Sequence, residues 1–144
     1  MTLAVDVIKK MTQRSVTLAT CESLTGGGIG AALTSVPGAS AVYRGSLVTY
    51  ARELKSTLAG VDEELIATEG VVNELTALQM ARGAQARCDA DWAVATTGVA
   101  GPTETDGAMP ARVPEPATPP LPPPPPMDWA MMPLELSPSA MMVP

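Results

Sequence analysis

The sequence contains no histidine, and this absence excludes several kinds of active site. A Ser-His-Asp triad or a Cys-His pair needs imidazole as its base, and many catalytic zinc sites need it as a ligand. Proton transfer on this chain must therefore use lysine, tyrosine, cysteine or a carboxylate. Phenylalanine is also absent and aromatic residues make up only 3% of the chain, so the core must be built from aliphatic side chains and methionine.

Cysteine is scarce as well. Cys21 and Cys88 do not form a CxxC pair, so neither a disulfide framework nor a thiolate metal site is indicated, and a reduced, cytoplasmic protein is predicted. No stretch reaches the roughly 18 consecutive apolar residues of a membrane span. Polar residues 12–14 follow Lys9 and Lys10 where a signal peptide would need an apolar run, so we predict no targeting segment and no membrane partner.

Basic residues are few. Nine lysines and arginines stand against fifteen aspartates and glutamates, which gives a net charge of −6. An acidic chain of this kind lacks the electrostatic attraction that holds proteins on nucleic acids or on anionic membranes. Neither is predicted as a partner.

The composition changes after Gly107. Thirteen of the 15 prolines and six of the nine methionines lie in residues 108–144, whereas all 12 glycines lie at or before Gly107. The chain of 144 residues is therefore interpreted as one domain, 1–107, followed by a proline-rich and methionine-rich tail, 108–144. The tail is expected to be disordered and to form no packed element, because proline fixes φ and removes a backbone donor. Its alternatives are a ligand for proline-recognising domains and a non-native reading frame.

Strands and helices are predicted to alternate along residues 1–107. Apolar residues recur at helical spacing from Leu3 to Met11. The other predicted elements are a strand at 15–21, a helix at 29–36, a strand at 42–50, a helix at 51–59, a helix at 63–68 capped by Asp62, a helix capped by Asn73 that continues to about Cys88, and a strand at 92–97. This order is typical of a layered α/β domain, in which ligands gather at the loops that follow the carboxyl ends of strands. Three such loops are predicted, at 22–28, 50–55 and 97–102.

The glycine-rich loop 22–28 is the first candidate site. Glycines after a strand let backbone amides approach a phosphate or an oxyanion, and Ser23 would lie beside them. The alternative is a tight turn in which Ser23 or Thr25 caps the next helix. The segment also fits the loose dinucleotide pattern G-x-G-x-x-G/A, but residues 46–51 lack the acidic residue that would bind a ribose, and no Walker A sequence exists.

Lys55 and Tyr50 form the second candidate. Lys55 is the only lysine near a predicted site loop, and a buried lysine can lose its proton near neutral pH and act as a base toward a serine hydroxyl. The alternative is a solvated lysine paired with a neighbouring carboxylate. Cys21 is a rival nucleophile, although the last residue of an apolar strand is more often a small buried filler.

Four segments of the sequence match one family pattern in the same order. The pattern A-E-S-x-T-G-G is present as Cys21 to Gly27, L-T-x-V-P-G-A-S as Leu33 to Ser40, Y-x-x-x-x-K as Tyr50 to Lys55, and T-G-I-A-G-P as Thr97 to Pro102. Over about residues 3–102 the chain thus resembles the C-terminal domain of the competence and damage-inducible protein A (CinA) family, whose members include nicotinamide mononucleotide amidases.

The resemblance implies hydrolysis of the carboxamide of nicotinamide mononucleotide to a carboxylate, with release of ammonia, during pyridine nucleotide recycling and without a metal or other cofactor. It makes Ser23 the nucleophile and Lys55 its base or the group that lowers its pKa, while Tyr50 and Thr97 orient the carboxamide. The remaining expected substrate contacts are Glu22, Thr25, Gly26, Gly27 and Gly98. Our own inference from the loop is that the backbone amides of residues 25–27 cradle the oxyanion or phosphate.

The chain also departs from the family pattern. After Gly-Pro the family continues with a further strand and a final helix, whereas here the proline-rich tail follows. We therefore expect a layered α/β/α sandwich around a mixed sheet that lacks the last strand and helix. Asn73 replaces a small hydroxyl residue near the site, and Cys21 replaces alanine. Residues 1–107 are expected to be marginally stable or to associate into a homo-oligomer.

Three functional hypotheses follow. The first is an amidase-type domain acting on nicotinamide mononucleotide. The second is a catalytically impaired relic, or a module of the same fold that binds a nucleotide without cleaving it. The third is an interaction protein that works through its polyproline tail.

Overall fold

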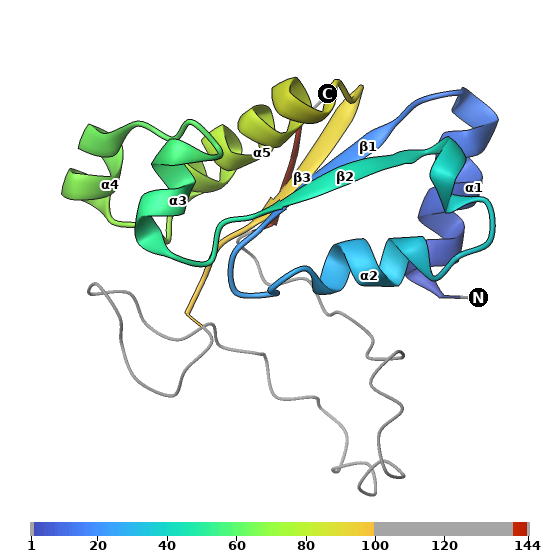
Figure 1. The fold of residues 1–144 in the computed structure, drawn as a ribbon, viewed down its shortest axis with the longest axis horizontal. Helices are drawn as coiled ribbons and strands as arrows, with labels where there is room; N and C mark the ends of the chain where they lie inside the picture. Colours follow the sequence, from blue (N-terminus) through green and yellow to red (C-terminus); the bar gives the residue numbers. More distant parts are fainter. Residues whose placement is uncertain (1, 100–139, 144) are drawn as a thin grey trace, which may run out of the picture.

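The computed structural model describes residues 2–99 and 140–143 (Figure 1). Its helices are α1 (Leu3–Arg14), α2 (Gly28–Thr34), α3 (Arg52–Thr57), α4 (Glu63–Glu69) and α5 (Glu74–Cys88), with a short 3-10 helix η1 (Ala39–Ala41), and its strands are β1 (Leu18–Glu22), β2 (Tyr43–Val48), β3 (Trp92–Thr96) and β4 (Ala140–Val143). Each element predicted between residues 3 and 97 is present, with ends shifted by a few residues. None of the described helices is long and apolar enough to cross a membrane.

The four strands form one mixed sheet in the order β2-β1-β3-β4. β1 runs parallel to both β2 and β3, and β4 is antiparallel to β3. The register aligns Glu22 at the end of β1 with Val48 of β2 and Thr96 of β3. The residues that follow these three strands therefore leave the sheet at one edge, which is where ligands of parallel sheets gather.

β4 corrects one expectation about the tail. The sequence predicts no packed element after Gly107, yet residues 140–143 pair with β3 along the sheet. Proline's lack of a donor explains why a long proline run avoids a sheet, but Ala140–Val143 contains no proline. The remainder of the predicted tail, 108–139 and residue 144, lies outside the described residues.

Alternation along β1 builds two cores, one on each face of the sheet. Leu18 faces α1 and α2, where it packs with Ile8 and Leu33. Ala19 and Cys21 face the opposite way and pack among residues of α4, α5 and β3. Figure 1 shows α1 and α2 on one side of the sheet and α5 on the other. The predicted α/β/α sandwich around a mixed sheet is thus confirmed.

The α5 side of the sheet is packed closely because its residues are small. Ala93 and Ala95 of β3 lie under Ala81 and Ala84 of α5, and all four are fully buried. A Cβ added to Gly83 of α5 would lie 1.8 Å from the backbone oxygen of the Ala59 residue in the segment after α3. Glycine at this position therefore lets the chain that carries α3 and α4 approach α5.

Both predicted caps are present. The side chain of Asp62 accepts a hydrogen bond from the Glu64 amide at 2.9 Å, and the side chain of Asn73 accepts one from the Thr76 amide at 2.8 Å. Such bonds satisfy donors that the first turn of a helix leaves unpaired. They fix the starts of α4 and α5.

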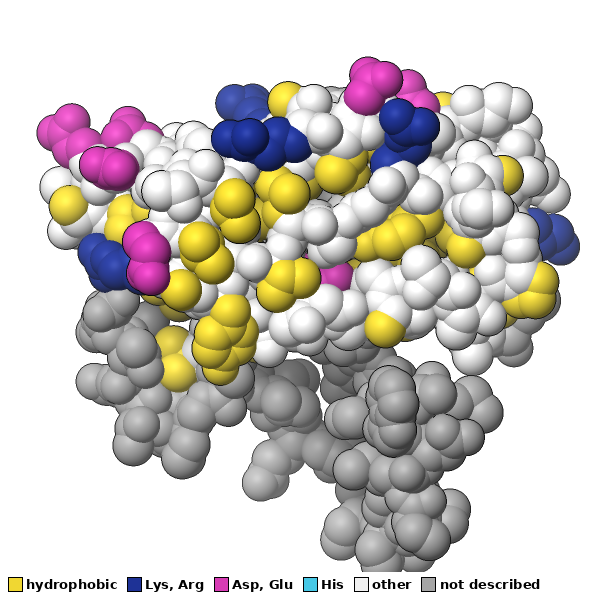
Figure 2. Space-filling view, in the orientation of Figure 1, with side chains coloured by type: hydrophobic (Ala, Val, Ile, Leu, Met, Phe, Trp, Pro, Cys, Tyr) yellow, Lys and Arg dark blue, Asp and Glu magenta, His cyan; other side chains and the backbone are white. Residues whose placement is uncertain are grey.

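Several large apolar side chains remain exposed on the described surface, namely Leu3, Val48, Tyr50, Leu58 and Leu75. Figure 2 shows hydrophobic side chains in a broken band across one face, with charged side chains mainly near its margins. Exposed apolar area can serve association, but nothing in the fold shows a partner on it. Association of the domain stays a prediction.

Candidate active site

Ser23 and Lys55 meet in the interior of the protein. Ser23 is the first residue after β1, and Lys55 lies in the last turn of α3. The Lys55 Nζ is 3.0 Å from the Ser23 Oγ, and the two residues are only 2% and 5% exposed. A lysine amine at this distance from a serine hydroxyl can exchange a proton with it. The alternative of a solvated surface lysine is therefore wrong for Lys55.

Backbone carbonyls at the end of β2 also hold the lysine. The Lys55 Nζ donates to the Thr49 oxygen at 2.8 Å and to the Tyr50 oxygen at 3.4 Å. The Thr49 amide in turn donates to the Glu22 backbone oxygen at 2.8 Å, which extends the β1–β2 pairing by one step. Sequence reasoning missed Thr49, which carries no motif signal. Its contribution comes from its carbonyl, and that follows only from strand register.

The neighbouring strand β3 fixes the backbone of Ser23. The Ser23 amide donates to the Thr96 oxygen at 3.0 Å, and the Ser23 oxygen accepts from the Gly26 amide at 3.0 Å. The hydroxyl of Thr96 lies 2.9 Å from that of Thr25. Thr96 was also missed, and only its place at the end of a strand could have suggested it.

Glu22 is completely buried, and its carboxylate is surrounded by donors. Two are hydroxyls, of Thr20 at 3.2 Å and Thr25 at 2.7 Å. Three are backbone amides at the start of α2, of Gly27 at 3.0 Å, Ile29 at 3.0 Å and Gly30 at 2.8 Å.

These bonds correct three expectations about substrate binding. The carboxylate of Glu22 is occupied by internal donors, so it caps α2 and is not placed to contact a substrate. The amides of Gly26 and Gly27 are bonded to the Ser23 oxygen and to Glu22, so they are not available as a cradle for phosphate or an oxyanion. The Thr25 hydroxyl donates to Glu22. The Thr25 amide is different, because no hydrogen-bond partner is present for it among residues 2–99 and 140–143.

Thr97 is buried beside the site, but its hydroxyl is already used. It donates to the Val71 oxygen at 2.6 Å, which ties the α4–α5 connection to the end of β3. The oxygen of this hydroxyl can still accept a hydrogen bond from a carboxamide N–H, so its role in orienting the carboxamide stays a prediction. The sequence could not show the bond to Val71, because Val71 is distant along the chain.

Tyr50 and Gly98 lie beside the pair formed by the Ser23 and Lys55 side chains and are not part of it. The side chain of Tyr50 is 64% exposed, and it is the backbone oxygen of this residue that contacts Lys55. A Cβ on Gly98 would lie 3.3 Å from two carbon atoms of the Leu24 side chain. Gly98 thus allows the 97–99 segment to pass closely over the residue that follows Ser23.

Cys21 is a buried filler, as the alternative interpretation predicts. It is fully buried, and its sulfur lies 3.7 Å from the Thr49 hydroxyl. Burial raises the pKa of the Cys21 thiol to about 11, although the hydrogen bond with the Thr49 hydroxyl acts in the opposite direction. A thiol with this pKa is protonated at neutral pH and is not a competing nucleophile.

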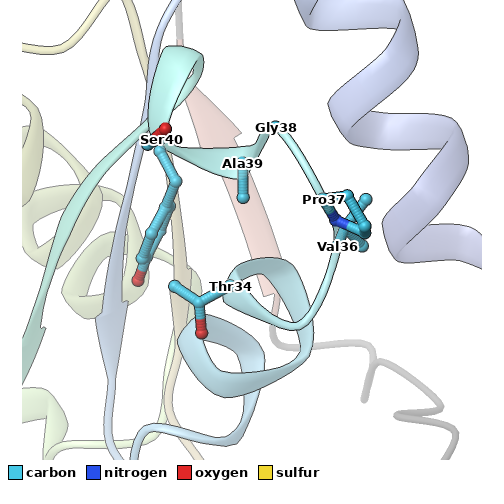
Figure 3. A pocket seen from close by; sticks show the side chains of 7 residues that line it. Thr34, Val36, Pro37, Gly38, Ala39 and Ser40 are labelled. Atoms are coloured by element: carbon cyan, nitrogen blue, oxygen red, sulfur yellow. The ribbon is translucent and has the colours of Figure 1, made fainter.

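A separate hollow of about 470 Å³ lies between α2 and β2 (Figure 3). It is lined by Thr34, Val36, Pro37, Gly38, Ala39, Ser40 and Tyr43. None of these residues belongs to the Ser23 and Lys55 contact, and none carries a formal charge. The hollow is therefore not the place where the candidate chemistry would occur.

Comparisons with known proteins agree with the fold and with the sequence motifs. The family model described as CinA C-terminal domain matches residues 1–112. A "CinA-like protein" of Frankia casuarinae is 53% identical over 96 residues, which are 67% of this chain and 22% of that protein. A "CinA-like protein" of Prochlorococcus marinus is 43% identical over 102 residues, or 71% of this chain and 24% of that protein.

Solved structures give the same result. A competence/damage inducible protein from Agrobacterium tumefaciens has a TM-score of 0.71 and 44% identity over 75% of this chain and 66% of that one. A competence-damaged protein (CinA) superfamily protein from Escherichia coli has a TM-score of 0.73 and 30% identity over 76% of this chain and 64% of that one. The chain spans about a quarter of the length of the curated relatives it matches. It belongs to the CinA C-terminal domain family.

Proposed function

We propose that this domain is a Ser-Lys amidohydrolase that converts the carboxamide of nicotinamide mononucleotide to the carboxylate and releases ammonia, as a cytoplasmic enzyme of pyridine nucleotide recycling. The observation that carries the proposal is the buried contact of 3.0 Å between Lys55 Nζ and Ser23 Oγ. The choice of substrate rests on the family resemblance.

The contacts of Lys55 suit the role of a base. A neutral amine has two N–H groups and one lone pair, and the carbonyl oxygens of Thr49 and Tyr50 can only accept. When the two N–H groups face these oxygens, the lone pair faces the Ser23 hydroxyl. Burial favours the neutral form of a lysine, because removing a charge from water is costly.

The reaction then proceeds in two steps, formation of an ester at Ser23 and hydrolysis of that ester. Lys55 takes the proton of Ser23 as the Ser23 Oγ attacks the amide carbon, and the same proton passes to the leaving nitrogen as the C–N bond breaks and ammonia departs. Water then attacks the resulting ester, and Lys55 takes one proton from that water and returns it to the Ser23 Oγ. The product leaves as the carboxylic acid and loses its remaining proton to solvent, which gives the carboxylate. The Thr25 amide is the candidate donor to the negative oxygen in both steps.

The test is ammonia release from nicotinamide mononucleotide by the purified chain beside Ser23→Ala, with equilibrium binding measured on both proteins. We expect release by the wild-type chain, and loss of release with retained binding in the variant. Saturable binding without release by a folded wild-type chain would contradict the amidase proposal and would favour the nucleotide-binding module instead.

A further inference from the structure

Glu22 directly precedes Ser23, yet its carboxylate lies beneath the glycine loop and not in the path of a substrate. It is fully buried and accepts hydrogen bonds from five donors. Three of the donors are amides at the start of α2, the position where a helix attracts an anion. The protein's own carboxylate therefore fills the place that a phosphate takes in phosphate-binding loops.

We propose that Glu22 is a positioning residue, whose carboxylate holds the glycine loop and thereby fixes the Ser23 Oγ against Lys55. This inference rests on the proposed role of Ser23 as nucleophile. It also places the phosphate of a nucleotide substrate away from the start of α2, because a second anion there would find its amides occupied and would be repelled by Glu22.

Hydrogen bonds link the carboxylate to the nucleophile along the backbone. The Thr25 hydroxyl donates to Glu22 Oε2 at 2.7 Å and lies 2.9 Å from the Thr96 hydroxyl. Gly26, the next residue, donates its amide to the Ser23 oxygen, while the Ser23 amide donates to the Thr96 oxygen. The loop that carries Ser23 is thus held to β3 on one side and to the Glu22 carboxylate on the other.

The surroundings of Glu22 select a carboxylate over an amide of the same shape. The Oε1 atom faces the Thr20 hydroxyl and the Gly30 amide, and the Oε2 atom faces the Thr25 hydroxyl and the amides of Gly27 and Ile29. A glutamine would place an NH2 group against at least one backbone N–H. Two donors then face each other without an acceptor, so the loop must shift.

Gly30 supports the same arrangement. A Cβ there would lie 2.6 Å from the Tyr43 hydroxyl and 3.5 Å from Glu22 Oε1. The Tyr43 hydroxyl is 2.7 Å from that of Thr20, which donates to Glu22. Burial raises the pKa of Tyr43, so its hydroxyl keeps its proton at neutral pH and can donate it to the Thr20 oxygen. Side chains and backbone around Glu22 are fitted to one orientation of its carboxylate.

The experiment compares Glu22→Gln with Glu63→Gln, which removes the same charge from an exposed residue in the first turn of α4. Each chain is checked for folding by circular dichroism. The rate of Ser23 modification by phenylmethylsulfonyl fluoride is followed by mass spectrometry, and kcat and KM for ammonia release are measured separately. Because displacement of a reacting group by about 1 Å costs on the order of 100-fold, we expect Glu22→Gln to lower both the labelling rate and kcat by about 100-fold with KM within about 3-fold. Glu63→Gln should resemble the wild-type chain.

A Glu22→Gln chain that labels at the wild-type rate but shows a raised KM would overturn the inference, because Glu22 would then contact the substrate. If Glu22→Gln does not fold, Thr20→Val and Thr20→Ser decide the matter. The valine removes a hydroxyl donor from Glu22 and the serine keeps it. We expect labelling to slow by about 10-fold in the valine variant and to return to within about 3-fold in the serine variant. Equal labelling in both would overturn the inference.

The labelling measurement separates this inference from the choice of substrate. A wild-type chain that labels at Ser23 but releases no ammonia refutes the proposed substrate, and the labelling rates of the variants still test Glu22. A folded wild-type chain that does not label at Ser23 overturns both proposals, because no activated serine would exist for Glu22 to position.

Discussion

The Lys55 Nζ lies 3.0 Å from the Ser23 Oγ across 32 positions of sequence, inside a protein that has no histidine. The two residues belong to different elements, one following β1 and the other in α3. Parallel strands in register bring them together, because Ser23 and Thr49 leave the sheet side by side and Thr49 leads directly into α3. The contact therefore depends on the sheet as much as on the two side chains.

Gly83→Ala tests the close packing of α5. In an ordinary helix this change stabilises by about 1 kcal/mol, because alanine is the better helix former. Here the added Cβ would lie 1.8 Å from the Ala59 backbone oxygen, so we expect the free energy of unfolding to fall by about 3 kcal/mol. Chemical denaturation measures it.

Ala86→Gly on the exposed side of α5 is the matched control, and it should cost about 1 kcal/mol from helix propensity alone. An increase in stability for Gly83→Ala would contradict close packing of the Ala59 backbone against Gly83 of α5.

Thr97→Val tests whether the Thr97 hydroxyl tethers the α4–α5 connection. The change leaves the Val71 oxygen without its donor, and we expect the free energy of unfolding to fall by about 1–2 kcal/mol. Amides of residues 70–73 should exchange faster with solvent in Thr97→Val, as measured by hydrogen exchange, and remain slow in Thr97→Ser. Unchanged exchange together with a raised KM would instead give Thr97 the substrate-orienting role that the family resemblance implies.

Because the Cys21 thiol is buried, we expect the folded state to lose stability at high pH. The thiol's folded pKa of about 11 exceeds the unfolded value of 9.0, so the folded state binds the thiol proton more tightly. This stabilisation is complete below about pH 9 and is lost as the pH rises to about 11. A shift of this size corresponds to about 2–3 kcal/mol.

Denaturant titrations of the wild-type chain, Cys21→Ala and Cys88→Ala between these pH values measure the effect. The fall in stability should be smaller in Cys21→Ala and unchanged in Cys88→Ala. Equal slopes in all three chains would show that Cys21 ionises as easily in the folded state as in the unfolded one.

Local signals in the sequence predict much of the fold. Asp62 and Asn73 precede helices with the short polar side chains that caps need, and the structure confirms both bonds. Ser23 and Lys55 could be proposed because the chain lacks histidine and has few lysines. The structure adds their contact and their burial.

The features that sequence reasoning missed depend on tertiary contacts. Glu22 was predicted to contact substrate. The amides that occupy its carboxylate come together only when α2 folds back over β1, so the local sequence does not show them. The roles of the Thr49 and Thr96 carbonyls follow from strand register and not from residue type. β4 was missed because the surrounding proline content obscured a short segment without proline.

A double-mutant cycle tests whether Ser23 and Lys55 act as one catalytic unit, as proposed. The measurement is kcat for ammonia release by the wild-type chain, Ser23→Ala, Lys55→Met and the double variant, in which methionine fills the space of the lysine side chain as far as its Cε atom. Residues that act as a unit give losses that do not add. We expect the double variant to be no slower than either single variant. Losses that multiply in the double variant, or a Lys55→Met chain that retains the wild-type kcat, would contradict the proposal.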